Sequence, residues 1–111
     1  MSDEPPVEFR MDERRHGDTV ILTLHGELDL ASSELVDARL GELRADGTPV
    51  LLDLDALDFM DSSGLRLVLN AAETSDATGW QFSVTHGPEQ VQRLFESTLV
   101  TARLPIVPRP D

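Results

Sequence analysis

The chain has 111 residues, a length that supports one compact domain around a single hydrophobic core. It carries 9 Lys plus Arg against 21 Asp plus Glu, a formal net charge of -12, and every basic residue is an arginine. This acidity disfavours nucleic acid and anionic membranes as partners, and the lack of lysine and cysteine excludes Schiff bases, phosphate-loop lysines, thiolate metal sites and disulfides.

Both ends of the chain predict short tails around one domain. Residues 1–6 are acidic and contain two prolines, so we expect a disordered N-terminal tail, a domain over residues 7–108 and a C-terminal tail at 109–111. The start lacks the basic and apolar regions of a secretory signal, and no apolar run approaches the roughly 18 residues that cross a bilayer. We therefore expect a cytoplasmic protein without direct membrane insertion.

The first segment of the domain predicts a β-hairpin. Val7, Phe9 and Met11 alternate with charged residues, and residues 19–25 beyond the turn at 16–18 are rich in β-branched side chains. We expect this antiparallel pair to form one edge of the sheet.

Helices and strands alternate in the middle of the chain. An apolar stripe predicts a helix that reaches about Arg44, with Ser32 or Ser33 as its N-cap. The apolar run at 50–54 predicts a buried central strand, parallel to the strand before it. Residues 55–60 are expected to be a connection to a second helix, which begins around Asp61 and ends at Gly79.

The last third predicts a strand over residues 80–85, a helix that begins at Gly87-Pro88, and a short edge strand over residues 104–107. The order β-β-α-β-α-β-α-β indicates an α/β fold. We expect a mixed, mostly parallel sheet with an antiparallel edge hairpin, packed with about three to four helices.

Two acids, Asp53 and Asp55, follow the central strand at the position where phosphotransferases place a nucleophilic aspartate. Such a site also needs a positive group on the phosphoryl oxygens, usually a lysine, which this chain lacks. We therefore favour a structural role for the two acids over a catalytic one. His16, His25 and His86 lie far apart in the sequence without metal-ligand spacing, so we expect neither a metal nor a cofactor.

The segment F-M-D-S-S-G-L at residues 59–65 carries the strongest functional signal. A single Asp or Ser would cap the following helix, and Gly64 within its first turn costs about 0.5 to 1 kcal/mol relative to alanine. A serine hydroxyl at a helix N-terminus lies where the helix dipole favours a phosphate, by about 0.3 to 1 kcal/mol. A phosphoacceptor serine fits this segment, whereas the Gly-x-Ser-x-Gly pattern of serine hydrolases is not matched.

These residues, together with G-E-L-D at 26–29, resemble the STAS-domain family, in particular its single-domain anti-sigma factor antagonists of bacterial partner-switching systems. The resemblance spans roughly residues 7–107 and includes L-D-L at 52–54 and a weaker match, V-Q-R-L-F, at 91–95. It implies a fold that agrees with the predicted order of elements. It also implies a phosphorylation-controlled binding protein rather than an enzyme.

The resemblance further implies a set of site residues and partners. Ser62 matches the regulated phosphoacceptor of the family. When unphosphorylated, such a protein would bind an anti-sigma factor that is an ATP-binding serine kinase, and the sigma factor would be released. The kinase would inactivate the antagonist by phosphorylating Ser62, and a partner serine phosphatase would reverse the modification. The implied partner-binding residues are Asp29, Phe59, Met60, Asp61, Ser63, Gly64 and Leu65.

One position departs from the family pattern, which usually has a glycine in the turn after the third helix where this chain has Thr98. A rival interpretation from another functional class is a STAS-type accessory subunit of a lipid or anion transporter without a phosphorylation cycle. The retained D-S-S-G at residues 61–64 argues against that rival. A neighbouring gene for an anti-sigma kinase would favour the switch, and neighbouring genes for transporter subunits would favour the rival.

Overall fold

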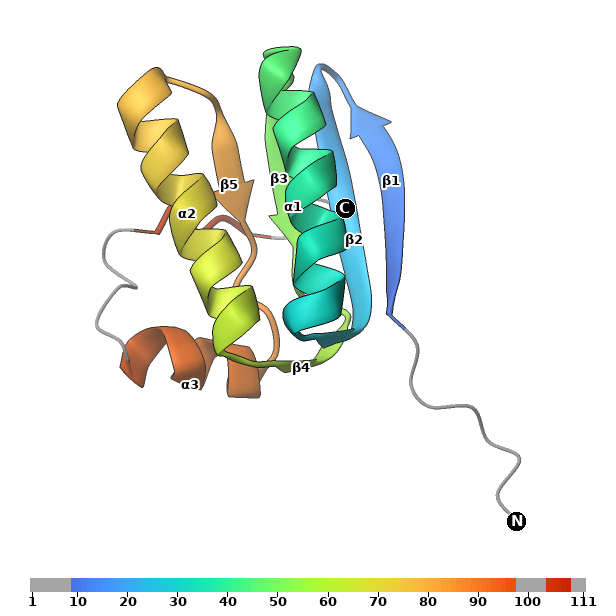
Figure 1. The fold of residues 1–111 in the computed structure, drawn as a ribbon, viewed down its shortest axis with the longest axis vertical. Coiled ribbons are helices and arrows are strands. Elements are labelled where there is room, and N and C mark those ends of the chain that lie inside the picture. Colours follow the sequence, from blue (N-terminus) through green and yellow to red (C-terminus); the bar gives the residue numbers. More distant parts are fainter. Residues whose placement is uncertain (1–8, 98–103, 109–111) are drawn as a thin grey trace.

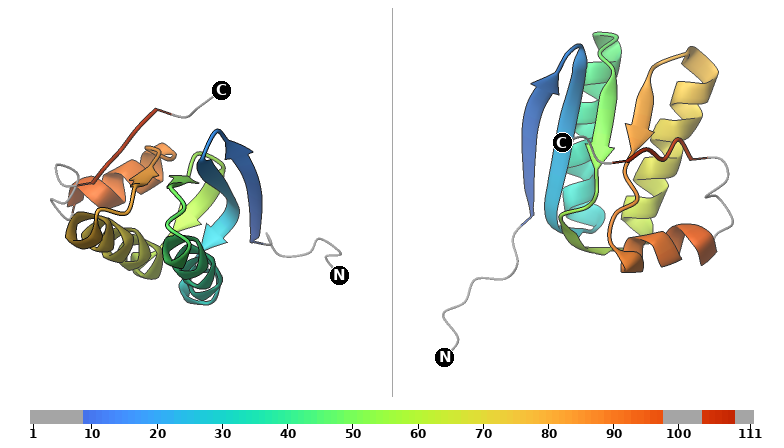
Figure 2. Two further views of the ribbon diagram at one scale, coloured as in Figure 1. Left: turned by 90° about the horizontal axis from the view of Figure 1, so that it is seen from above. Right: turned by 180° about the vertical axis from the view of Figure 1, so that it is seen from behind.

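The structure, a computed structural model, describes residues 9–97 and 104–108. It is a mixed sheet of five strands with two long helices side by side on one face and a third helix across one end of the sheet (Figure 1, Figure 2). The predicted α/β class and its antiparallel edge hairpin are confirmed.

Four strands form the main path of the sheet in the order β1-β2-β3-β5. β1 (Arg10–His16) pairs antiparallel with β2 (Thr19–Leu28) and forms one edge. β3 (Val50–Asp53) is fully buried and runs parallel to β2, as the apolar run predicted, and β5 (Phe82–Val84) runs parallel to β3. Val7 lies outside the described residues.

Three helices complete the described part of the chain. α1 (Leu30–Ala45) and α2 (Ser62–Thr78) cover the same face of the sheet, while α3 (Glu89–Ser97) crosses the end of the sheet beneath the start of α2 (Figure 1). α1 buries its predicted apolar stripe because that stripe faces the sheet. The main core cluster joins this stripe to the inward side chains of the strands, among them Val36, Leu40, Leu43, Val20, Leu22, Leu24, Leu52 and Val84.

The expected connection at residues 55–60 contains a strand, so that prediction was wrong. β4 (Leu57–Met60) pairs in parallel with the last residues of β2, beyond a shift in register between Gly26 and Glu27. Its two end residues are buried and the two between them are exposed. This pattern lacks the alternation that identifies a strand in a sequence.

The N-cap predicted for α1 was also wrong, since the helix begins earlier and its cap is Asp29 rather than Ser32 or Ser33. α2 has the predicted ends: Asp61 caps its start, and Gly79 ends it in the left-handed conformation, with φ 79°, that glycine adopts without strain. α3 starts one residue after Pro88, whose carbonyl accepts hydrogen bonds from the first turn.

The C-terminal segment returns to the sheet beside β5. Ile106 forms an isolated parallel bridge with Val84, and the Val84 N–H donates to the carbonyl of Pro105. The predicted edge strand is therefore present as a single bridge. Thr98 lies outside the described residues. Among the helices that the structure describes, none is both long and apolar enough to span a bilayer.

Candidate functional site

The two segments that carry the family resemblance meet at one end of the sheet. β2 leads into α1 and β4 leads into α2, and because β4 runs parallel to the end of β2, the two helices begin side by side (Figure 1). The Asp61 N–H donates to the carbonyl of Leu28 at 3.2 Å and ties the two helix starts together. Both helices are capped by an aspartate, Asp29 for α1 and Asp61 for α2.

Asp61 caps α2 through one carboxylate oxygen and its backbone carbonyl. Its Oδ1 accepts from the N–H of Ser63 at 2.8 Å and from the N–H of Gly64 at 3.3 Å, while its carbonyl accepts from Leu65. A side chain that satisfies such N–H groups at the first turn stabilises a helix by about 0.5 to 2 kcal/mol. The carboxylate therefore holds the first turn of α2, and with it Ser62, in a defined position.

Asp29 forms a capping box at the start of α1. Its Oδ1 accepts from the N–H of Ser32 at 3.0 Å, and its own N–H donates to the Ser32 hydroxyl at 2.9 Å. The N–H of Ser32 and, as the second cause, its hydroxyl both donate to Oδ1 of Asp29 and hold the pKa of the Asp29 carboxyl below its ordinary value. Asp29 thus stays ionised beside the second helix start.

A groove of about 250 Å³ runs between the starts of the two helices, and Ser62 lies in it with an exposed side chain. Ser63 is half-buried next to it. We call this feature the α1–α2 groove; its lining residues are Leu30, Ser33, Glu34, Asp37, Ser62, Ser63, Arg66, Leu67 and Asn70.

Exposed apolar side chains lie on the same helix starts and on β4. Leu30, the first residue of α1, is 65% exposed, and Phe59 of β4 is 42% exposed. Large exposed apolar side chains next to polar and charged ones are typical of protein-binding surfaces. Of the apolar positions that we expected at the partner surface, Phe59 is thus open to a partner.

Three other expected positions lie beneath this surface. Met60, Gly64 and Leu65 are all buried. A Cβ built on Gly64 would lie 2.7 Å from Cγ of Met60 and 2.9 Å from a methyl carbon of Leu28, so glycine is required there by packing. These residues shape the surface from below rather than presenting side chains on it.

Of the residues that line the groove, the sequence interpretation had named only Ser62 and Ser63 as site residues, and it missed Leu30, Ser33 and Arg66 among the others. Ser33 is only 7% exposed, and its hydroxyl has no hydrogen-bond partner among the described residues. Arg66 is exposed, and it joins no ion pair within the described part of the chain. Their spacing could have identified the α1 residues, because the lining positions of α1 recur at i, i+3, i+4 and i+7, the pattern of a single helix face.

The acids after the central strand have structural partners. Asp53 is buried and accepts from the hydroxyls of Thr23 and Thr85, both at 3.3 Å, and from the N–H of Asp55 at 3.0 Å. Asp55 in turn accepts from the N–H of Gly87 at 3.0 Å. These hydrogen bonds join the middle of β2 to the ends of β3 and β5, which supports the structural interpretation of the two carboxylates.

The histidines lie apart from the groove. His25 contacts Asp12 across the β1–β2 hairpin, with 3.0 Å between Nε2 and Oδ2. Over residues 9–97 and 104–108, no three His, Cys, Asp or Glu side chains gather as they would around a metal ion.

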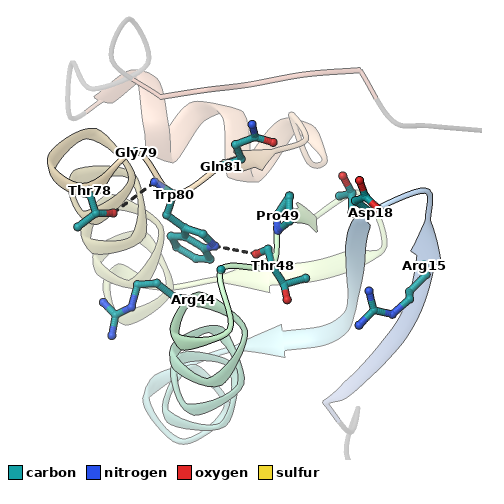
Figure 3. Close-up of a pocket in the computed structure, with 11 residues that line it drawn as sticks. Arg15, Asp18, Arg44, Thr48, Pro49, Thr78, Gly79, Trp80 and Gln81 are labelled. Atoms are coloured by element: carbon teal, nitrogen blue, oxygen red, sulfur yellow. Dashed lines mark hydrogen bonds between the residues drawn. The ribbon is translucent and has the colours of Figure 1, made fainter.

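A hollow of about 1170 Å³ lies at the opposite end of the molecule, around the C-terminal ends of the two long helices and the β1–β2 turn (Figure 3). Trp80 lines it, and the indole N–H donates to the carbonyl of Thr48 at 2.8 Å (Figure 3). Arg15 and Arg44 also line it, but none of the residues implied by the family resemblance does. We therefore take the α1–α2 groove as the candidate site.

A family profile described as STAS domain matches residues 10–110, nearly the whole chain. The chain belongs to the STAS-domain family. A protein named anti-sigma F factor antagonist from Paenibacillus polymyxa is 28% identical to this STAS domain over 102 residues, which is 90% of this chain and 87% of that protein.

Solved structures show the same fold. The crystal structure of an anti-sigma factor antagonist from Mycobacterium paratuberculosis has a TM-score of 0.82 at 21% identity and covers 95% of this chain and 90% of that one. SpoIIAA, an anti-sigma factor antagonist described as a Bacillus cell fate determinant, has been solved unphosphorylated and phosphorylated, with TM-scores of 0.74 and 0.71 at 23% and 22% identity. The unphosphorylated form covers 94% of this STAS domain and 90% of its own chain, and the phosphorylated form covers 94% and 93%.

Proposed function

We propose that this STAS domain is an anti-sigma factor antagonist, a binding protein rather than an enzyme, that is switched off by phosphorylation of Ser62. The observation that carries the proposal is the place of Ser62: this exposed residue lies at the first position of α2, in the α1–α2 groove. The names of the relative and of the structural neighbours support the general role, and the phosphorylated state of SpoIIAA supports the form of control.

In the unphosphorylated protein, the helix starts would dock on an anti-sigma factor. Leu30 and Phe59 supply exposed apolar area, and Asp29 supplies a fixed negative charge beside them. Binding would displace the sigma factor that the anti-sigma factor holds. We propose that this partner is an ATP-dependent serine kinase and that a serine phosphatase restores the active form.

The switching step is a phosphoryl transfer. The Oγ of Ser62 attacks the γ-phosphorus of ATP, the bond from that phosphorus to ADP breaks, and the hydroxyl proton passes to a base of the kinase. The product carries about 1.5 to 2 additional negative charges next to Asp61. A docking surface that must bury this phosphate loses affinity, by tenfold for about every 1.4 kcal/mol of penalty.

The phosphoacceptor is tested by mixing the protein with its cognate kinase and ATP. We expect a phosphate on Ser62, no modification of Ser62→Ala, and constitutive binding of the kinase by that variant. Ser63→Ala is the matched control, because it removes the neighbouring hydroxyl and should leave Ser62 phosphorylated. Mass spectrometry that finds the phosphate on another residue, or no phosphate at all, would contradict the proposal.

The electrostatic basis of the switch is tested separately with Ser62→Asp. Because Ser62 is exposed, the added carboxylate should leave the melting temperature nearly unchanged. It should weaken the complex with the kinase, as measured by calorimetry, whereas Ser62→Asn, of similar size and without charge, should weaken it less. Equal affinities for the charged and uncharged variants would exclude charge as the cause of release.

A further inference from the structure

Two residues of the α1–α2 groove, Arg66 and Ser33, have no described partner and lie where they could bind a phosphate on Ser62. Arg66 lies four residues after Ser62 on α2, and both line the α1–α2 groove. Residues four apart on a helix lie one above the other on the same face. Side chains on a helix also tilt toward its N-terminus, so a long side chain at position 66 extends over the turn that holds Ser62.

The charges of the groove make Arg66 distinctive. Among the described residues that line it, Arg66 is the only basic one, while Glu34 and Asp37 face it from α1. Asp61 adds a third carboxylate at the start of α2. A phosphate on Ser62 would therefore lie near three carboxylates, and Arg66 is the one cationic side chain of the groove that could pair with it.

The helix start itself has limited capacity for a phosphate. The N–H groups of Ser63 and Gly64, which point out of the first turn, already donate to Oδ1 of Asp61. A phosphoryl group on Ser62 therefore has to find other donors. The guanidinium of Arg66 offers several N–H groups in a planar fork that suits phosphate oxygens.

Ser33 provides an independent indication that the groove takes a polar group. Its side chain is more than nine-tenths buried, and its hydroxyl has no hydrogen-bond partner in the described part of the chain. A buried hydroxyl without a partner is destabilising, and such groups are rare in folded proteins. An acceptor oxygen placed in the groove would supply the missing bond.

We propose that the phosphoryl group on Ser62 lies in the α1–α2 groove, where the Arg66 guanidinium pairs with it and the Ser33 hydroxyl donates to it. This proposal rests on the proposed function, because it presumes that Ser62 is the phosphoacceptor. Its consequence is that phosphorylation does more than add charge to the docking surface. It also withdraws the one basic side chain of the groove from any partner that binds there.

The Arg66 contact is tested on protein with phosphoserine inserted at position 62 during translation, so that no kinase is needed. The observable is the second pKa of the phosphoserine, followed by ³¹P NMR in the full chain. A paired guanidinium favours the dianion, so Arg66→Gln should raise this pKa by about 0.3 unit or more, the size expected for an ion pair four residues apart on a helix. Arg66→Lys, which keeps the charge but loses the planar fork, should give an intermediate value.

Arg14→Gln is the matched control, since it removes the same charge from an exposed position on β1, far from the groove. We expect it to leave the phosphoserine pKa unchanged. Equal pKa values in the parent protein and Arg66→Gln, with both proteins folded by circular dichroism, would overturn the pairing. That result would leave phosphorylation by the kinase untouched, and failure of the kinase to modify Ser62 would equally leave the pKa comparison intact.

The Ser33 contact is tested by thermal unfolding of Ser33→Ala with and without the phosphoserine. Without it, removing an unpaired buried hydroxyl should leave the melting temperature unchanged or raise it. With it, the same substitution loses a hydrogen bond to phosphate and should lower the melting temperature. The same change in both backgrounds would overturn the role of Ser33.

Discussion

Gly64 fixes how closely the first turn of α2 approaches the sheet. Its Cα faces Met60 and Leu28 at distances that leave no room for a methyl group, since a Cβ would lie 2.7 Å and 2.9 Å from their side-chain carbons. We expect Gly64→Ala to destabilise the protein by about 1 to 3 kcal/mol, the cost of overpacking a close-packed core. Urea unfolding followed by circular dichroism measures this difference.

Gly41 provides the matched control within α1. A Cβ at that position would meet no atom within 4 Å, and alanine is favoured over glycine in a helix interior by about 0.5 to 1 kcal/mol. Gly41→Ala should therefore stabilise the protein while Gly64→Ala destabilises it. If Gly64→Ala proved as stable as the parent protein, the close packing at the start of α2 would not constrain the helix.

The packing role of Gly64 could be predicted only in part from the sequence. Its cost in a helix was visible in the sequence, but the residues that require glycine there were not. The contacts show that two core side chains select it, and they come from 36 and 4 positions earlier in the chain, at Leu28 and Met60. Such packing depends on tertiary distances that residue types alone do not encode.

At the scale of single elements, the start of α1 is governed by one ionised cap. Hydrogen bonds from Ser32 lower the pKa of Asp29 in the folded protein, so its contribution to stability is present above its ordinary pKa of 3.8 and is lost as the pH falls through the lower folded value. We expect Asp29→Ala to lower the melting temperature at neutral pH, and the difference from the parent protein to shrink in acid.

The substitution Asp29→Asn distinguishes the effect of the negative charge at residue 29 from the effect of its hydrogen bonds as an N-cap. Asparagine accepts the same hydrogen bonds at an N-cap but does not titrate, so this variant should keep more stability than Asp29→Ala at neutral pH. The difference in melting temperature between Asp29→Asn and Asp29→Ala should vary less with pH than the difference between the parent protein and Asp29→Ala. Melting curves across the acid range measure both effects, and a pH-independent loss in Asp29→Ala would show that ionisation of the cap is not what stabilises α1.

Most elements could be predicted because their sequence patterns are local, as with the β-branched residues of β2, the apolar stripe of α1 and the apolar run of β3. β4 could not, because its short pattern of two exposed residues between buried ends carries no period, and its pairing partner is the far end of β2. The α1 cap was misplaced for a related reason. Three polar residues, Asp29, Ser32 and Ser33, can each cap a helix, and only the geometry of the turn selects among them.

For the candidate site, the sequence motifs located the two helix starts but not the groove between them. The groove depends on how β2 and β4 pair, since their parallel alignment brings α1 and α2 together. Arg66 and Ser33 lie on faces that point toward each other only in the folded molecule. No local pattern in the sequence distinguishes them from other polar residues on an exposed helix.

At the scale of the whole molecule, we expect the net charge of -12 to affect association with the proposed partner rather than the proposed switch. Under the proposed function, phosphorylation of Ser62 would add about 1.5 to 2 charges to this total, a small fraction, so release would have to depend on where the phosphate lies. The overall field, by contrast, attracts a basic surface on a partner before contact is made. The two effects can therefore be separated by measuring rates and affinities independently.

We expect the rate constant for association with the kinase to fall by about tenfold or more as salt is raised from low to physiological concentration, because salt screens the attraction. Glu34→Gln, in the groove, should slow association more than Asp18→Asn, which removes the same charge at the opposite end of the molecule. Stopped-flow mixing measures these rates. A rate constant that does not respond to salt would exclude electrostatic steering, and equal effects of the two variants would assign the attraction to net charge rather than to the field around the groove.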